Sequence, residues 1–122
     1  MKTILICSAI IAALSFTTGD KLTGRWESQR SSKGNVTGVV FKSDNRFEGY
    51  INKKPFVTGT YTFQDSIFSF VDNGCNGMKG VYKVIFNNNS DSMRFEAIQD
   101  SCVQRKEGML KLVLGRVIKK VE

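Results

Sequence analysis

The absence of histidine limits the chemistry that this 122-residue sequence can perform. Histidine is the commonest general base and a frequent metal ligand. The serines form no recognisable arrangement with a base, and no glycine-rich phosphate loop joins a strand to a helix. Asp65, Asp72 and Asp100 follow strand-like runs, where turn-forming hydrogen bonds account for carboxylates. We therefore expect no enzyme activity, no catalytic residue and no cofactor, and we expect Asp100 to form a turn or to pair with Arg105.

Two of the three cysteines, Cys75 and Cys102, are expected to form a disulfide. Cys7 lies in an N-terminal segment typical of export signals, and two cysteines in an exported domain usually pair. Free thiols and a thiolate metal site are the alternatives, but the sequence has no histidine and no C-x-x-C pair to supply metal ligands. The bridge would close a loop of about 28 residues and stabilise the domain by roughly 3 to 4 kcal/mol.

Residues 1–19 have the composition of a secretory signal peptide. A basic residue is followed by an apolar core over residues 4–14 and then by small or polar residues. The apolar run, about a dozen residues, is shorter than the roughly twenty that span a membrane; a short uncleaved anchor is the alternative. We expect a secreted or periplasmic protein whose residues 20–122 form one domain. Cleavage is expected after Ser15, Thr17 or Gly19.

The net charge of +7 favours association with anionic surfaces, including nucleic acid and lipid headgroups. The basic residues are nevertheless scattered, and their densest clusters are the pairs Lys53–Lys54 and Lys119–Lys120. Scattered charge is typical of a solvated surface, and an exported protein rarely meets nucleic acid. We therefore expect no nucleic-acid partner.

Residues 20–122 have the pattern of a series of short strands. Runs of aromatic and β-branched residues are separated by Gly, Asn, Asp and Ser, which favour turns. Regular spacing of this kind is typical of an antiparallel sandwich or barrel. We expect strands within residues 22–29, 36–42, 46–52, 56–63, 66–71, 78–86, 92–98 and 109–117.

Alternating side chains indicate one dry face and one wet face for several of these runs. Met93 and Phe95, for example, alternate with Arg94 and Glu96. Glycines inside strands weaken a flat sheet but permit the tight bends of a small barrel. We therefore expect an all-β fold, a small antiparallel up-and-down barrel of about eight strands. The glycines in question are Gly24, Gly38, Gly49 and Gly59.

The C-terminal segment has two interpretations. Residues 103–108 could form one helical turn before a last strand in which Leu110, Leu112 and Leu114 share a face. Alternatively, a C-terminal helix packs on the barrel. We expect the strand, which would close the sheet.

The aromatic residues are the candidates for ligand contact, because ligand pockets are mainly apolar with a few polar groups. An eight-stranded barrel is either filled by its side chains or holds one small ligand. The short strands favour a filled or nearly filled core. Tyr61 and Tyr82 are the strongest candidates, since a buried hydroxyl needs a partner. The full set of candidate ligand contacts is Phe47, Tyr61, Phe63, Phe68, Phe70, Tyr82 and Phe95.

The motif Gly24-Arg25-Trp26 resembles the G-x-W motif on the first strand of the lipocalin-like (calycin) barrels. The resemblance implies that Trp26 lies at the closed end of the barrel and that an arginine from the last part of the chain packs across it. Arg105 and Arg116 are the candidates, and such a cation–π contact contributes about 0.5 to 2 kcal/mol. Gly24, Trp26 and Arg105 are the residues assigned to barrel closure.

A longer pattern is similar to that of small exported bacterial lipocalin-like proteins. Its order is G-x-Y, a strand, a cysteine in a glycine-rich turn, a second G-x-Y, and D-x-C-x-x-R. The chain lacks the T-D-Y-like turn of longer lipocalins. Its first strand is also similar to avidin-like barrels, but their biotin sites require further tryptophans. The residues that match the longer pattern are Gly59, Tyr61, Cys75, Gly80, Tyr82, Asp100, Cys102 and Arg105.

Together these observations predict an exported lipocalin-like barrel that binds a small hydrophobic molecule in its open end. The alternative is a ligand-free structural or protein-interaction module of the cell envelope. A hydrolase or hydrolase inhibitor has the least support. A cavity larger than roughly 300 Å³ would favour ligand binding. We expect no transmembrane segment in the mature chain, and the sequence predicts no particular oligomeric state.

Overall fold

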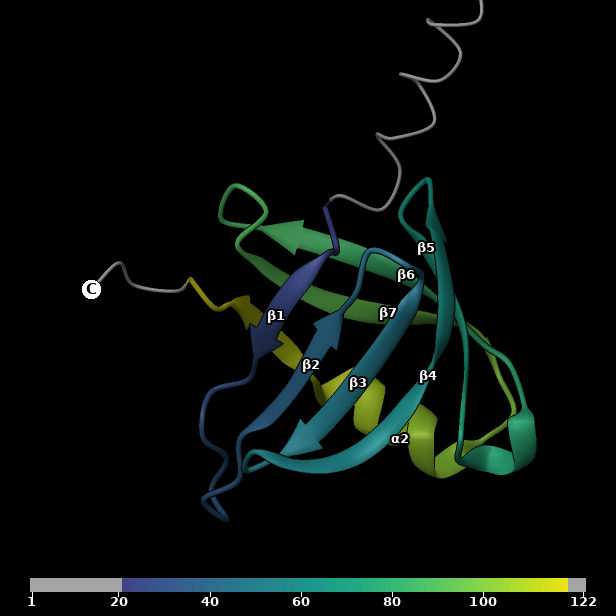
Figure 1. Ribbon diagram of the computed structural model, residues 1–122, viewed down its shortest axis with the longest axis horizontal. Coiled ribbons are helices and arrows are strands. Elements are labelled where there is room, and N and C mark those ends of the chain that lie inside the picture. The colour runs from purple at the N-terminus through teal and green to yellow at the C-terminus, as the bar shows by residue number, and fades with distance from the viewer. Residues whose placement is uncertain (1–20, 119–122) are drawn as a thin grey trace, which may run out of the picture.

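The computed structural model describes residues 21–118, which form a closed antiparallel barrel of eight strands. Each strand pairs with the next along the chain, and the last strand pairs with the first (Figure 1). The expected small up-and-down barrel is therefore confirmed. The expected signal peptide, residues 1–19, lies outside the described residues.

Every strand expected from the sequence is present, with shifted ends. The first four are β1 (Gly24–Glu27), β2 (Thr37–Phe41), β3 (Arg46–Ile51) and β4 (Lys54–Gln64). The last four are β5 (Ile67–Asp72), β6 (Gly80–Asn87), β7 (Ser92–Asp100) and β8 (Val113–Arg116). A short 3₁₀ turn, η1 (Cys75–Gly77), precedes β6, and a helix, α2 (Val103–Lys111), precedes β8.

Two tight hairpins show why polar residues separate the strands. Asn52 and Lys53 join β3 to β4, and Asp65 and Ser66 join β4 to β5. All four residues have positive φ angles. Two-residue loops of this conformation match the right-handed twist of the strands that they connect. Asn and Asp tolerate the left-handed region better than most residues. Asn52 and Asp65 between the strand-like runs therefore indicate the positions of these two hairpins.

The C-terminal segment contains both a helix and a strand, and the expected boundary between them is wrong. Residues 109–111 belong to α2, and Leu110 is exposed on that helix rather than aligned on a strand. β8 is short and pairs with β7 only at residues 92–94. α2 lies between β7 and β8 in the chain and packs against β7 (Figure 1).

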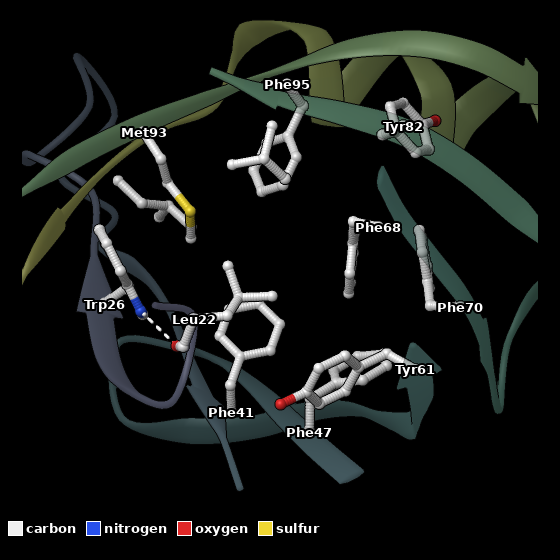
Figure 2. Close-up of a cluster of buried hydrophobic side chains, with 12 residues drawn as sticks. Leu22, Trp26, Phe41, Phe47, Tyr61, Phe68, Phe70, Tyr82, Met93 and Phe95 are labelled. Atoms are coloured by element: carbon white, nitrogen blue, oxygen red, sulfur yellow. Dashed lines mark hydrogen bonds between the residues drawn. The ribbon is translucent and has the colours of Figure 1, made fainter. Parts of the chain in front are cut away.

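Trp26 closes one end of the barrel, which we call the floor. Its side chain is fully buried, and its Nε1 donates a hydrogen bond of 2.9 Å to the carbonyl of Leu22 (Figure 2). The guanidinium of Arg116 lies 4.2 Å from the indole centre. Arg116 can reach the ring because it pairs directly with Trp26 between β8 and β1. Gly24 has a φ of 125°, a conformation that favours glycine.

The assignment of Arg105 to closure at Trp26 is wrong. Arg105 belongs to α2, and its guanidinium lies 4.7 Å from the ring of Phe70 instead. Arg116 also donates hydrogen bonds to the carbonyls of Lys21, Thr23 and Ser90. The arginine that stacks on the indole therefore also ties the segment before β1 to the β6–β7 turn.

The expected disulfide between Cys75 and Cys102 is present. Cys102 is the N-cap residue of α2, and Cys75 begins η1. The bond therefore fixes the start of the helix to the loop between β5 and β6, across a separation of 27 residues.

We expect the double substitution Cys75→Ser and Cys102→Ser to lower the free energy of unfolding by roughly 3 to 4 kcal/mol, because the crosslink no longer restricts the unfolded chain. Urea denaturation of the variant and of the oxidised wild type measures the difference. The reduced wild type is the control and should resemble the double variant. Equal stability of all three proteins would contradict the prediction.

Candidate functional site: a cavity at the open end of the barrel

A cavity of about 600 Å³ occupies the end of the barrel opposite Trp26. Exposed residues that line its entrance, including Phe56, Asn73 and Gln104, show that it opens to solvent. We call this entrance the mouth. The loops after β1, β3 and β5 and the start of α2 surround it. The expectation of a filled or nearly filled core holds for the floor, where buried side chains pack together. It is wrong for the mouth, because the cavity there exceeds the volume of roughly 300 Å³ at which ligand pockets begin.

One wall of the cavity consists of phenylalanine rings. Phe68 stacks on Phe70 with ring centres 4.7 Å apart, and Phe47 meets the Phe70 ring edge to face at 5.8 Å. Phe41 and Phe95 also contact Phe68 (Figure 2). Edge-to-face and offset-stacked contacts of this kind stabilise aromatic clusters beyond the effect of burial alone. The wall is therefore fixed by its own contacts rather than by a ligand.

Helix α2 forms the opposite wall. Gly108, Met109 and Leu112 line the cavity from this side, and Leu114 of β8 continues the surface towards the floor. A Cβ atom placed on Gly108 would meet no heavy atom within 4 Å. Gly108 has no side chain to fill the space between the helix and the aromatic rings, so that space is open.

Four of the seven candidate ligand contacts line the cavity, namely Phe47, Phe68, Phe70 and Phe95. Tyr61, Phe63 and Tyr82 do not. The Tyr61 hydroxyl donates to the carbonyl of Lys42 at 3.1 Å, and Phe63 contacts the ring of Phe86. The Tyr82 hydroxyl donates to Asp100, so both tyrosines satisfy their hydroxyls within the protein.

Several lining residues were not predicted from the sequence. Phe41 pairs with Phe47 between β2 and β3, so its inward orientation could have been found from the alternation along residues 36–42. Phe56 lies where the β3–β4 pairing shifts register, which period-two alternation does not reveal. Met109 and Leu112 were assigned to a strand, and their position depends on the helix that forms instead.

An ion-pair cluster holds α2 in place beside the cavity. Arg105 donates to both carboxylate oxygens of Asp100, at 2.9 Å and 2.8 Å, and to Asp72 at 3.2 Å. It also donates to the carbonyl of Met78 at 2.9 Å. The side chains of all three charged residues are less than a tenth exposed. The expected pairing of Asp100 with Arg105 is confirmed, and the D-x-C-x-x-R pattern is explained as an anchor for the helix.

Asp100 is ionised within this cluster. Burial of its carboxyl opposes ionisation, but hydrogen bonds from Arg105, Tyr82 and the Cys102 N–H outweigh burial and hold the pKa below its ordinary value. Burial and the hydrogen bond to Asp100 raise the pKa of the Tyr82 hydroxyl. Tyr82 therefore keeps its proton, and its hydroxyl donates a hydrogen bond to the Asp100 carboxylate.

We expect the stabilisation by Asp100 to disappear in acid. Its folded-state pKa lies below the ordinary value of 3.8, so the contribution is complete above that value and is lost as the pH falls through the folded-state pKa. Chemical denaturation of the wild type and Asp100→Asn, measured from about pH 7 to about pH 2, tests this. The difference in unfolding free energy should shrink towards low pH, and a difference independent of pH would contradict the assignment.

Among residues 21–118, no group of three or more Cys, Asp and Glu side chains is arranged to hold a metal ion. Within the same range, no helix has both the length and the apolar character needed to cross a bilayer. Comparison of the chain with protein-family models and with curated proteins gives no match.

Proposed function

We propose that this chain is an exported lipocalin-like barrel that binds a small hydrophobic molecule without transforming it. The observation that carries the proposal is the cavity of about 600 Å³, walled by phenylalanine rings on one side and by α2 on the other. Pockets for small molecules have volumes of roughly 300 to 1,000 Å³ and are lined mainly by apolar and aromatic groups. Trp26 closes the floor, so such a molecule would enter through the mouth.

The charge of the lining favours a ligand that is neutral or weakly polar. Arg105 reaches the cavity, but Asp72 and Asp100 already neutralise it. An anionic group on the ligand would have to compete with two buried carboxylates for this guanidinium. The apolar rings therefore supply the affinity, and polar groups of the ligand are expected near Gln104 at the mouth.

Export is supported by the disulfide, because such bonds form and persist in oxidising compartments. The signal-like composition of residues 1–19 points to the same route. We propose that the protein works in the periplasm or outside the cell. Neither observation bears on the identity of the ligand.

Titration with N-phenyl-1-naphthylamine, an uncharged apolar dye that fluoresces more strongly when desolvated, tests the proposal. We expect saturable binding of one dye molecule to each chain, because within residues 21–118 the phenylalanine wall lines one cavity. Heat-denatured protein is the control for adsorption to exposed apolar surface. Absence of saturable binding, or equal binding by the denatured chain, would overturn the proposal.

A further inference from the structure

The rim of the mouth combines exposed apolar side chains with lysines. Phe56, beside the β3–β4 hairpin, is 68% exposed, and Val103, at the start of α2, is 65% exposed. Four exposed lysines lie at the same end of the barrel, in the β3–β4 hairpin, at the start of β4, in the loop before β6 and on α2; they are Lys53, Lys54, Lys79 and Lys106. We call these six residues the rim.

The positive charge of the rim is not neutralised by ion pairs. None of its four lysines forms a salt bridge within the described residues 21–118. Asp72 and Asp100 at this end are paired with Arg105, and Glu27 at the end of β1 accepts a hydrogen bond from the Tyr50 hydroxyl. Glu107, the single acidic residue of α2, lies between basic residues at positions 106 and 111. The rim therefore presents net positive charge to solvent.

Away from the mouth, several basic side chains form ion pairs. Near the β2–β3 turn, Lys42 pairs with Glu48 at 2.8 Å, and Arg46 pairs with Asp44 at 2.9 Å. On β7, Arg94 pairs with Glu96, within the same strand. Three of the cations on that part of the surface are therefore paired with carboxylates, whereas in the described part of the chain the four lysines of the rim are not.

We propose that the rim docks on an anionic lipid surface, with Phe56 and Val103 entering the headgroup region and the lysines contacting lipid phosphates. Exposed apolar side chains accompanied by lysines are typical of interfacial membrane contacts. Each lysine near an anionic surface strengthens binding by roughly fivefold. Docking would bring the mouth against the bilayer, so that an apolar molecule could pass between lipid and cavity; this last step rests on the proposed function.

A lipid surface fits the rim better than a protein surface does. Lysine is depleted at protein interfaces, whereas aromatic residues and arginine are enriched there. The rim has one aromatic side chain and four lysines. A bilayer also requires no shape complementarity. This suits the rim, whose side chains are spread over the β3–β4 hairpin, the start of β4, the loop before β6 and α2.

Vesicle sedimentation tests the inference with the wild-type protein. We expect binding to vesicles in which roughly a third of the lipid is phosphatidylglycerol, and little binding to phosphatidylcholine alone. Lys54→Glu and Val103→Ser should each weaken binding, the charge reversal by roughly fivefold or more. Neither residue lines the cavity, so both variants should keep the dye affinity of the wild type in solution.

Matched controls lie away from the mouth. Lys83 on β6 forms no salt bridge within residues 21–118, and Val113 on β8 is 55% exposed. Lys83→Glu reverses a charge as Lys54→Glu does, and Val113→Ser removes an exposed apolar side chain as Val103→Ser does. Vesicle binding by both control variants should stay within about twofold of that of the wild type. If rim and control variants lose vesicle binding equally, the net charge of the protein rather than the rim attracts it to the lipid, and the inference is overturned.

Two other results would also overturn the inference. One is the absence of binding to anionic vesicles. The other is capture of a specific protein that depends on Val103 without any vesicle binding, which would assign the rim to a protein partner. Because dye binding in solution is measured separately, failure of the docking surface is distinguishable from failure of the cavity.

Discussion

Replacing Asp100 with alanine should lower the free energy of unfolding by about 3 to 5 kcal/mol, because the substitution leaves a buried guanidinium short of its main partner. The Asp100 side chain is fully buried, and it accepts hydrogen bonds from Arg105, Tyr82 and the Cys102 N–H. Asp72 remains close to Arg105 but makes a single contact of 3.2 Å. Urea denaturation at neutral pH measures the loss.

Two further variants keep this prediction testable if the alanine variant does not fold. Asp100→Asn retains the shape and should lose less than the alanine variant. The double substitution of Asp100→Ala and Arg105→Met removes both charges and should recover part of the stability, because no uncompensated charge remains buried. If the double variant loses as much unfolding free energy as the two single variants lose together, the ion pair does not anchor α2.

Replacing Gly108 with leucine should reduce the affinity for an apolar dye by about tenfold or more while the barrel stays folded. Gly108 lines the cavity from the middle of α2, and nothing lies within 4 Å of the position of an added Cβ. The leucine side chain can therefore extend into the space between the helix and the phenylalanine wall. Leucine is also a better helix former than glycine, by up to about 1 kcal/mol.

Gly108→Ala is the matched control for the leucine variant. It should raise the unfolding free energy by up to about 1 kcal/mol, because Gly108 is exposed and helical. The single methyl group takes little of the cavity, so dye affinity should stay close to that of the wild type. If Gly108→Leu binds the dye as tightly as Gly108→Ala does, the dye is not held between α2 and the rings.

The barrel was predictable because its signals are local. Alternation such as that of Met93 to Glu96 fixes which side chains face inwards, and Asn or Asp at the hairpins marks the breaks. The pairing of Cys75 with Cys102 followed from the presence of only two cysteines after the expected signal segment. Neither inference required knowledge of long-range packing.

The helix and the cavity were not predictable in the same way. Leu110, Leu112 and Leu114 fit a strand by their spacing, yet tertiary packing against β7 makes the first of them helical. The cavity in turn depends on that helix, because Gly108 and Met109 line it only as part of α2. Likewise, Arg116 rather than Arg105 stacks on Trp26 because β8 pairs with β1 and places Arg116 opposite the indole. This long-range pairing cannot be read from the local sequence.

The methionines provide the most direct measurement of the central claim, which is that the cavity binds an apolar molecule. Met109 lines the cavity, Met93 is fully buried in the core on β7 and does not line it, and Met78 is exposed. In a protein labelled with ¹³C at its methionine methyl groups, titration with N-phenyl-1-naphthylamine should shift the Met109 signal strongly. The signals of Met93 and Met78 should move little. Saturable binding that shifts Met78 alone, or that leaves Met109 unmoved, would contradict the account.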